Sequence, residues 1–103
     1  MQLESRGYAG AILRINLKLG RTKVEPLAED IARLLLGGKG LGSYFLYKIA
    51  PKGVDPLSPQ NPLILATGPL TGTLAPSSGR FCVVTKSPTT GTMNDSHCGG
   101  FFG

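Results

Sequence analysis

Residues 62–85 read PLILATGPLTGTLAPSSGRFCVVT, and the clearest strand signals of the chain lie here. Two apolar runs, 63–67 and 80–85, enclose twelve residues that are rich in Gly, Pro, Ser and Thr. The first run, bounded by Pro62 and Gly68, predicts a strand covered on both faces. The second run predicts the next strand of the same sheet. The loop between them is longer than a hairpin needs, and such length usually serves a site.

Upstream of this unit, residues 11–17 alternate apolar and polar side chains, which predicts a half-buried strand. Residues 18–21 contain a permissive glycine and predict a turn. Residues 22–25 then predict the returning strand of a hairpin that ends at Pro26.

Two short helices are predicted next, because apolar residues now recur every three or four positions instead of every second position. The first begins at Leu27, and Gly37 and Gly38 are expected to end it. The second covers residues 41–49 and ends before Pro51. The stripes expected to face the core are Leu27, Ile31, Leu34 and Leu35 in the first helix, and Leu41, Phe45 and Ile49 in the second.

The remaining segments complete an α+β pattern with a mixed β-sheet and short helices. Residues 51–62 hold four prolines and predict an irregular surface connection. A short last strand is expected around residues 91–94. The two adjacent aromatics Phe101 and Phe102 are unusual at the end of a self-contained domain, so we interpret 1–103 as part of a larger one.

The charge is uneven, because nine of the eleven basic residues precede position 53. A non-catalytic module that binds an anion or a protein partner through this basic first half is therefore one hypothesis. The basic residues are scattered singly without an aromatic-interleaved signature, which disfavours nucleic acid. No apolar run approaches the length of a membrane span, and residues 1–6 lead into no signal-peptide-like segment, so we expect a cytoplasmic location.

Three glycine-rich stretches are candidates for binding anions. Residues 37–42 follow a helix and lack the third glycine of a dinucleotide fingerprint, which favours a packed helix corner. Arg80 lies at the end of the long loop. It could bind a phosphate through two parallel hydrogen bonds of its guanidinium group, or be a solvent-exposed arginine at a strand end. In the third stretch, residues 94–100, His97 and Cys98 are adjacent. Their side chains point to opposite sides of an extended chain and could hardly share one zinc ion or form a nucleophile–base pair.

Several of these motifs together resemble a known family. They are GGKGLG at 37–42, VDPLSP at 54–59, ATGPLTGT at 66–73, SGRF at 78–81, VTKSP at 84–88 and GGFFG at 99–103. Their order and spacing, from about Tyr8 onward, resemble the amino-terminal domain of the aldehyde:ferredoxin oxidoreductases.

This resemblance implies part of a tungsten- or molybdenum-dependent enzyme that oxidises an aldehyde to its carboxylic acid. It implies a bis-pterin cofactor with Mg²⁺, and electron transfer to ferredoxin through a 4Fe-4S cluster whose ligands lie outside this chain. The chain would be a partial cofactor-binding domain, half of a duplicated two-sheet structure. The implied partners are ferredoxin, a small aldehyde and the remaining domains of the enzyme, and a homo-oligomer is compatible with them.

The resemblance also assigns roles to three residues. Arg80 matches an arginine that contacts both pterin and cluster. His97 matches an asparagine whose main-chain oxygen helps to hold the magnesium ion between two pterin phosphates, and Gly99 matches a glycine whose backbone contacts the pterin. No catalytic residue is assigned, and neither Cys82 nor Cys98 receives a role. The isolated chain is expected to be inactive.

Overall fold

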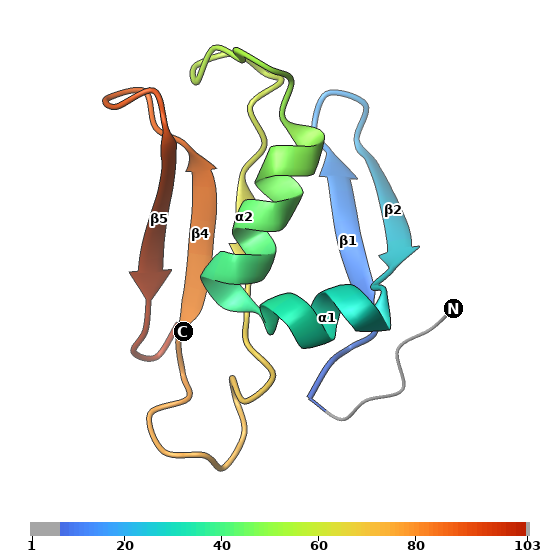
Figure 1. Cartoon of the computed structure of the whole chain (residues 1–103), viewed down its shortest axis with the longest axis vertical. Helices are drawn as coiled ribbons and strands as arrows, with labels where there is room; N and C mark the ends of the chain where they lie inside the picture. The colour runs from blue at the N-terminus through green and yellow to red at the C-terminus, as the bar shows by residue number, and fades with distance from the viewer. Residues whose placement is uncertain (1–6, 103) are drawn as a thin grey trace.

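The computed structural model describes residues 7–102 and has two small sheets side by side, with two helices on one side of them (Figure 1). Its elements are β1 (Ala11–Asn16), β2 (Arg21–Pro26), α1 (Glu29–Leu35), α2 (Gly38–Ile49), β3 (Ile64–Ala66), β4 (Phe81–Lys86) and β5 (Met93–Cys98). The predicted α+β class is confirmed. Where a mixed sheet was expected, the described strands form two antiparallel sheets, β1-β2 and β3-β4-β5. Within residues 7–102, neither helix has the length and apolar character of a transmembrane span. Residues 1–6, used above to argue against a signal peptide, lie outside the described residues.

The first sheet is the predicted hairpin. Leu13 pairs with Val24 in its register, and both side chains are exposed. The base of the hairpin is joined to the rest of the chain where the amide of Leu27 donates to the carbonyl of Gly10 over 3.0 Å. Ile12 packs nearby on the buried cluster of Leu27 and Ala32. The hairpin is thus attached at its base, while an apolar part of its surface is left uncovered by the described elements.

The first helix differs from its prediction in its buried face and its end. Leu34 was expected in the core but is 77% exposed, whereas Ala32 is fully buried, because the small side chain allows α1 to approach its neighbours closely. The chain leaves the helix through Leu36, not through a glycine. Leu36 has φ 64° and ψ −69°, and the amide of Gly37 donates to the carbonyl of Leu35 over 2.8 Å. This is a γ-turn, a strained conformation that reverses the chain within three residues.

The second helix is the central element of the fold. It begins at Gly38, three residues before the predicted start. Leu41 and Phe45 pack against the first buried cluster, as predicted. Leu46 is buried in a second cluster with Cys82 and Val84 of the β3-β4-β5 sheet. Because α2 contributes to both clusters, it joins the two halves of the core.

The second sheet is covered by α2 on one face only. Val84 is fully buried on that face. The prediction that residues 63–67 are covered on both faces is wrong, because Leu65 is 61% exposed and no described helix packs on the opposite face. The last strand was expected around residues 91–94 but is β5, Met93–Cys98. The turn that precedes this strand lies at residues 87–91, where the amide of Gly91 donates to the carbonyl of Ser87 over 2.9 Å. Residues 93–98 follow this turn and pair with β4.

The connections 50–63 and 67–80 are irregular, as predicted. In Figure 1 the second of these lies at the lower end of the molecule. The start of β4, the end of β5 and the amino-terminal end of α2 lie at the same end. The fold therefore brings all three glycine-rich stretches of the sequence to one end of the second sheet.

Candidate functional site

The first glycine-rich stretch packs α2 onto the sheet. A β-carbon at Gly37 would lie 2.5 Å from the carbonyl oxygen of Thr67, and one at Gly42 would lie 2.7 Å from Cγ2 of Val84. The amide of Gly38 donates to the carbonyl of Thr67 over 3.0 Å. Only glycine permits both approaches, so the interpretation as a packed helix corner is confirmed.

The long loop, residues 68–79, is held together by its own polar groups. The amide of Gly68 donates to Oγ1 of Thr71 over 2.9 Å, and the amide of Gly72 donates to the carbonyl of Ser78 over 2.6 Å. The Thr71 hydroxyl also donates to the carbonyl of Arg80 over 3.4 Å. These contacts fix where the chain emerges into β4, and with it the base of the arginine side chain.

The Arg80 side chain lies against the backbone of Gly99. A β-carbon at Gly99 would lie 3.2 Å from Cγ and 3.4 Å from Nε of Arg80. Phe81 pairs with Cys98, so Arg80 and Gly99 are the next residues beyond the paired strands. Arg80 is exposed and forms no ion pair with any residue between 7 and 102. Two of the three site residues predicted from the sequence are therefore neighbours, and a guanidinium is available there to a ligand.

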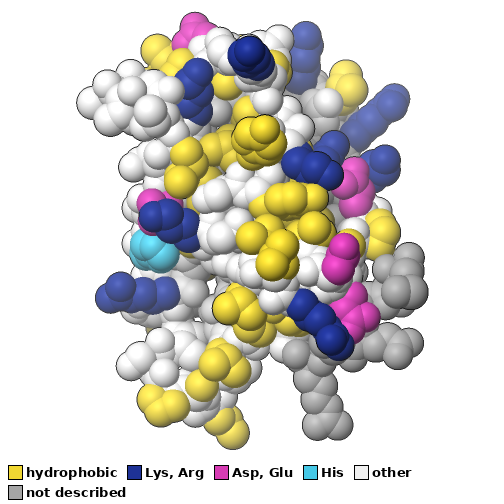
Figure 2. Space-filling model, in the orientation of Figure 1, with side chains coloured by type: hydrophobic (Ala, Val, Ile, Leu, Met, Phe, Trp, Pro, Cys, Tyr) yellow, Lys and Arg dark blue, Asp and Glu magenta, His cyan; other side chains and the backbone are white. Residues whose placement is uncertain are grey.

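His97, the third predicted site residue, lies in β5 and takes part in a charged cluster. Its Nε2 lies 3.2 Å from Oδ2 of Asp95, and Nζ of Lys39 in α2 lies 3.2 Å from Oδ1 of the same carboxylate. Figure 2 shows basic side chains above and below the histidine along one edge of the molecule. Hydrogen bonding to Lys39 is the main effect that lowers the pKa of Asp95, with a smaller contribution from His97. Asp95 thus joins β5 to the first turn of α2.

Cys82 completes this cluster and was not linked to it by the sequence. It pairs directly with His97 in the β4–β5 register. The thiol sulfur, the imidazole and the carboxylate each offer a ligand atom, and these atoms lie within 4.8 Å of one another. Burial raises the pKa of the Cys82 thiol, and the negative charge of Asp95 raises it further. Cys98 does not belong to the group, which agrees with the prediction that adjacent residues 97 and 98 point apart.

The sequence held one signal for the cluster. Asp95 and His97 are two residues apart, which places them on one face of a strand. The signal was hidden because the last strand was predicted to end at residue 94. The partners across the register, Cys82 and Lys39, depend on strand pairing and helix placement, which spacing within one segment does not reveal.

A family model of the aldehyde ferredoxin oxidoreductase N-terminal domain matches residues 12–103. The chain belongs to this family. The resemblance drawn from the glycine-rich motifs is thereby confirmed. Residues 80, 97 and 99 all lie within the matched region of the aldehyde ferredoxin oxidoreductase domain.

Relatives of this domain are found among oxidoreductases of Pyrococcus species. The tungsten-containing aldehyde ferredoxin oxidoreductase of Pyrococcus abyssi is 54% identical over 97 residues, and that of Pyrococcus horikoshii is 53% identical over the same length. These matches cover 94% of the chain and 16% of each relative. The chain therefore spans about one sixth of the length of these curated relatives. The WOR-like subunit of an aliphatic sulfonate oxidoreductase of Pyrococcus furiosus is 39% identical over 84 residues, covering 79% of the chain and 13% of that relative.

A solved structure has the same fold as this aldehyde ferredoxin oxidoreductase domain. It is the active site complex BamBC of benzoyl coenzyme A reductase with 1,5-dienoyl-CoA. The match has a TM-score of 0.85 and 34% sequence identity, and it covers 93% of this chain and 15% of that chain. Relatives whose names specify different substrates thus share this domain.

Proposed function

We propose that this chain is the amino-terminal, cofactor-binding part of a tungsten- or molybdenum-pterin enzyme that oxidises an aldehyde and water to a carboxylic acid. Electrons would leave through a 4Fe-4S cluster to ferredoxin. Family membership and the tungsten-containing relatives support the class of enzyme. The observation that carries the role of this chain is the placement of Arg80 on the backbone of Gly99.

The residues present fit an anionic pterin cofactor. An exposed guanidinium, unpaired among the described residues, stands beside a glycine and a loop of mainly small residues, so a phosphorylated ring system can approach the backbone. The bound cofactor supplies two-electron redox chemistry at its metal. Nothing within residues 7–102 supplies four thiolates for an iron–sulfur cluster, because Cys82 and Cys98 are the two cysteines of the chain.

The chain's own contribution is binding and orientation. The stem of Arg80 lies against Gly99, which would limit its rotamers and keep the planar guanidinium group beside the ligand. Two parallel N–H groups of the guanidinium can then donate to one phosphate or to a ring oxygen. The main-chain oxygen of His97 would help to hold a magnesium ion that neutralises phosphate charge, and the backbone of Gly99 would contact the pterin.

The same proposal covers the architecture. Residues 1–103 would form one of two similar β-rich halves of the cofactor-binding domain, with other domains of the enzyme packing on the surfaces that the described elements leave uncovered. Leu65 is exposed on the second sheet, and Phe102 is exposed near the end of the chain. Leu13 and Val24 are exposed on the hairpin. Apolar surface of this extent is typical of an interface.

The test replaces Arg80 in the complete natural polypeptide that contains this chain. Arg80→Ala removes charge-assisted hydrogen bonds worth about 1.5–3 kcal/mol, a loss of about 10- to 150-fold in cofactor retention or in the aldehyde-dependent reduction of ferredoxin. Metal content and turnover are measured separately, because the arginine is proposed to contact both redox centres. Arg80→Lys should restore only part of the effect, because an ammonium lacks the planar guanidinium.

Arg33 provides the matched control. It is an exposed arginine on α1, paired with Glu29 over 2.7 Å and remote in sequence from the site. Arg33→Ala should leave tungsten or molybdenum content and turnover unchanged. Equal metal content and turnover in Arg80→Ala and the wild type would refute the proposed role.

A further inference from the structure

We propose that Cys82, Asp95 and His97 form a binding site for a divalent transition-metal cation of the zinc type. The cation would join β4 to β5 just before the chain reaches Gly99. This site uses side chains, whereas the proposed magnesium contact uses the main-chain oxygen of His97. The inference does not depend on the proposed reaction.

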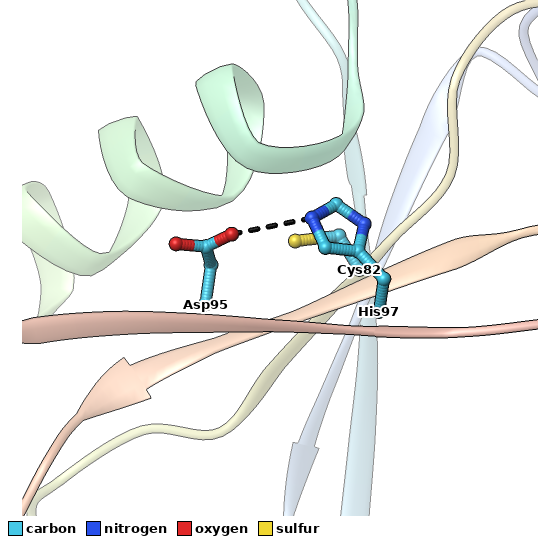
Figure 3. A group of neighbouring side chains, drawn as sticks. All are labelled: Cys82, Asp95 and His97. Atoms are coloured by element: carbon cyan, nitrogen blue, oxygen red, sulfur yellow. Dashed lines mark hydrogen bonds and ion pairs between the residues drawn. The ribbon is translucent and has the colours of Figure 1, made fainter.

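The geometry brings three different ligand atoms together. Figure 3 shows the Cys82 sulfur between the carboxylate of Asp95 and the imidazole of His97, with all three side chains on the face of the sheet that α2 covers. The three ligand atoms lie within 4.8 Å of one another, and Nε2 of His97 is already 3.2 Å from Oδ2 of Asp95. In a tetrahedral zinc site, bonds of 2.0–2.3 Å place neighbouring ligand atoms about 3.3–3.7 Å apart. Small side-chain rotations would therefore close the site.

The ligand chemistry selects the class of cation. Sulfur and imidazole nitrogen favour zinc and similar borderline-soft ions over magnesium or calcium, which prefer oxygen. A thiolate and a carboxylate together balance the charge of a divalent ion. When the cation binds, the Cys82 thiol releases one proton to solvent and the sulfur forms the new bond as a thiolate. His97 then carries its single ring proton on Nδ1, so that Nε2 binds the cation in place of its hydrogen bond to Asp95. Three protein ligands leave the fourth position to water.

The backbone supports this arrangement. Cys82 and His97 are directly opposed in the β4–β5 register, and Asp95 lies two residues earlier on the same face of β5. Ligands on paired strands are held more rigidly than ligands on loops. Lys39 contacts Oδ1 of Asp95, which orients the carboxylate so that Oδ2 faces Nε2 of His97, and the cation would lie between these two atoms.

Simple packing does not account for the cluster. A buried cysteine is often a small apolar filler, and Cys82 does pack with Leu46 and Val84. Such packing gives no reason for an imidazole and a carboxylate to converge on the thiol. The His97 side chain is 47% exposed and the Asp95 side chain is 25% exposed. The site is therefore open to solvent on the side of β5, and a cation would enter there.

The experiment uses the complete natural polypeptide that contains this chain. The protein is equilibrated with Zn²⁺ in slight molar excess and freed of unbound metal by gel filtration. Zinc per chain is then measured by mass spectrometry. X-ray absorption at the zinc edge should show one sulfur ligand at about 2.3 Å. Cys82→Ser should bind one zinc fewer than the wild type, and its dissociation constant should rise by more than about 10-fold.

The adjacent thiol provides the matched control, because Cys98 lies outside the cluster. Cys98→Ser should bind zinc like the wild type. His97→Gln should lose the same zinc ion as Cys82→Ser. Because His97 is half-exposed, this variant should fold, and it tests the proposed site even if Cys82→Ser does not fold. Arg80→Ala should keep the zinc, which separates this proposal from the proposed function. Equal zinc binding by the wild type and His97→Gln, or an equal loss in Cys98→Ser, would overturn the proposal.

Discussion

Gly42 sets the distance between α2 and the second sheet, so Gly42→Ala tests how the core is built. The new β-carbon would lie 2.7 Å from Cγ2 and 3.2 Å from Cβ of Val84, whereas carbon atoms in contact are about 3.5–4.0 Å apart. Val84 is fully buried and β-branched, so it has little freedom to move. Overpacking of this kind costs about 1–3 kcal/mol. The helix preference for alanine over glycine offsets about 1 kcal/mol, so we expect a net destabilisation of about 1 kcal/mol.

The double mutant makes the prediction sharper. In the background of Val84→Ala the methyl group at 2.7 Å is gone, and the remaining Cβ at 3.2 Å can shift into the space that it leaves. Gly42→Ala should then stabilise the protein by up to about 1 kcal/mol through helix preference. The effect of one substitution thus changes sign, and the coupling is about 2 kcal/mol. Native-state hydrogen exchange of amides in α2 and β4 measures the local free energy of opening, and each 1.4 kcal/mol changes the exchange rate tenfold. If Gly42→Ala has the same effect in both backgrounds, the close approach does not limit the packing.

Two further predictions concern the cluster at the end of the second sheet. Lys39 lowers the pKa of Asp95, so its ionised form stabilises the fold above the ordinary pKa of 3.8, and this contribution disappears as the pH falls through the lower folded value. The stability difference between the wild type and Asp95→Asn should therefore be present above the ordinary pKa and decrease as the pH falls, as measured by urea denaturation at a series of pH values. A difference that does not change with falling pH would contradict the ion pair. Cys98 should react with iodoacetamide faster than Cys82, because Cys82 is 2% exposed and burial raises the pKa of its thiol. Peptide mapping by mass spectrometry measures both reaction rates. Faster labelling of Cys82 would show that α2 does not cover this thiol.

Local patterns predicted most of the elements but not which faces they bury. The alternation in residues 11–17 identified β1, because the period of a strand is visible within one segment. The exposure of Leu65 was missed because an apolar run does not reveal whether an element covers its second face. Leu34 was expected in the core, and Ala32 is buried in its place for a similar reason. In a seven-residue helix, the direction of packing is set by neighbours from other parts of the chain.

The candidate site was predictable only in part. The loop and the exposed strand-end arginine were visible in the sequence, and the structure adds that Gly99 supports the stem of Arg80. The cluster at His97 was not predicted because it depends on three separate segments. Its cysteine comes from β4, its carboxylate from β5 and its lysine from α2. A one-residue shift in the β4–β5 register would turn Cys82 away from His97, so the cluster exists only through the observed pairing.

The close packing of α2 and the placement of the charged groups depend on one another. Lys39 reaches Asp95 because the first turn of α2 rests on the sheet, and that turn is anchored where Gly38 donates to the carbonyl of Thr67. Thr67 directly precedes the long loop that leads to Arg80. Any side chain that lifts the start of the helix would therefore loosen the ion pair and shift the loop together. The glycines at this corner act on the site by keeping α2 close to the sheet.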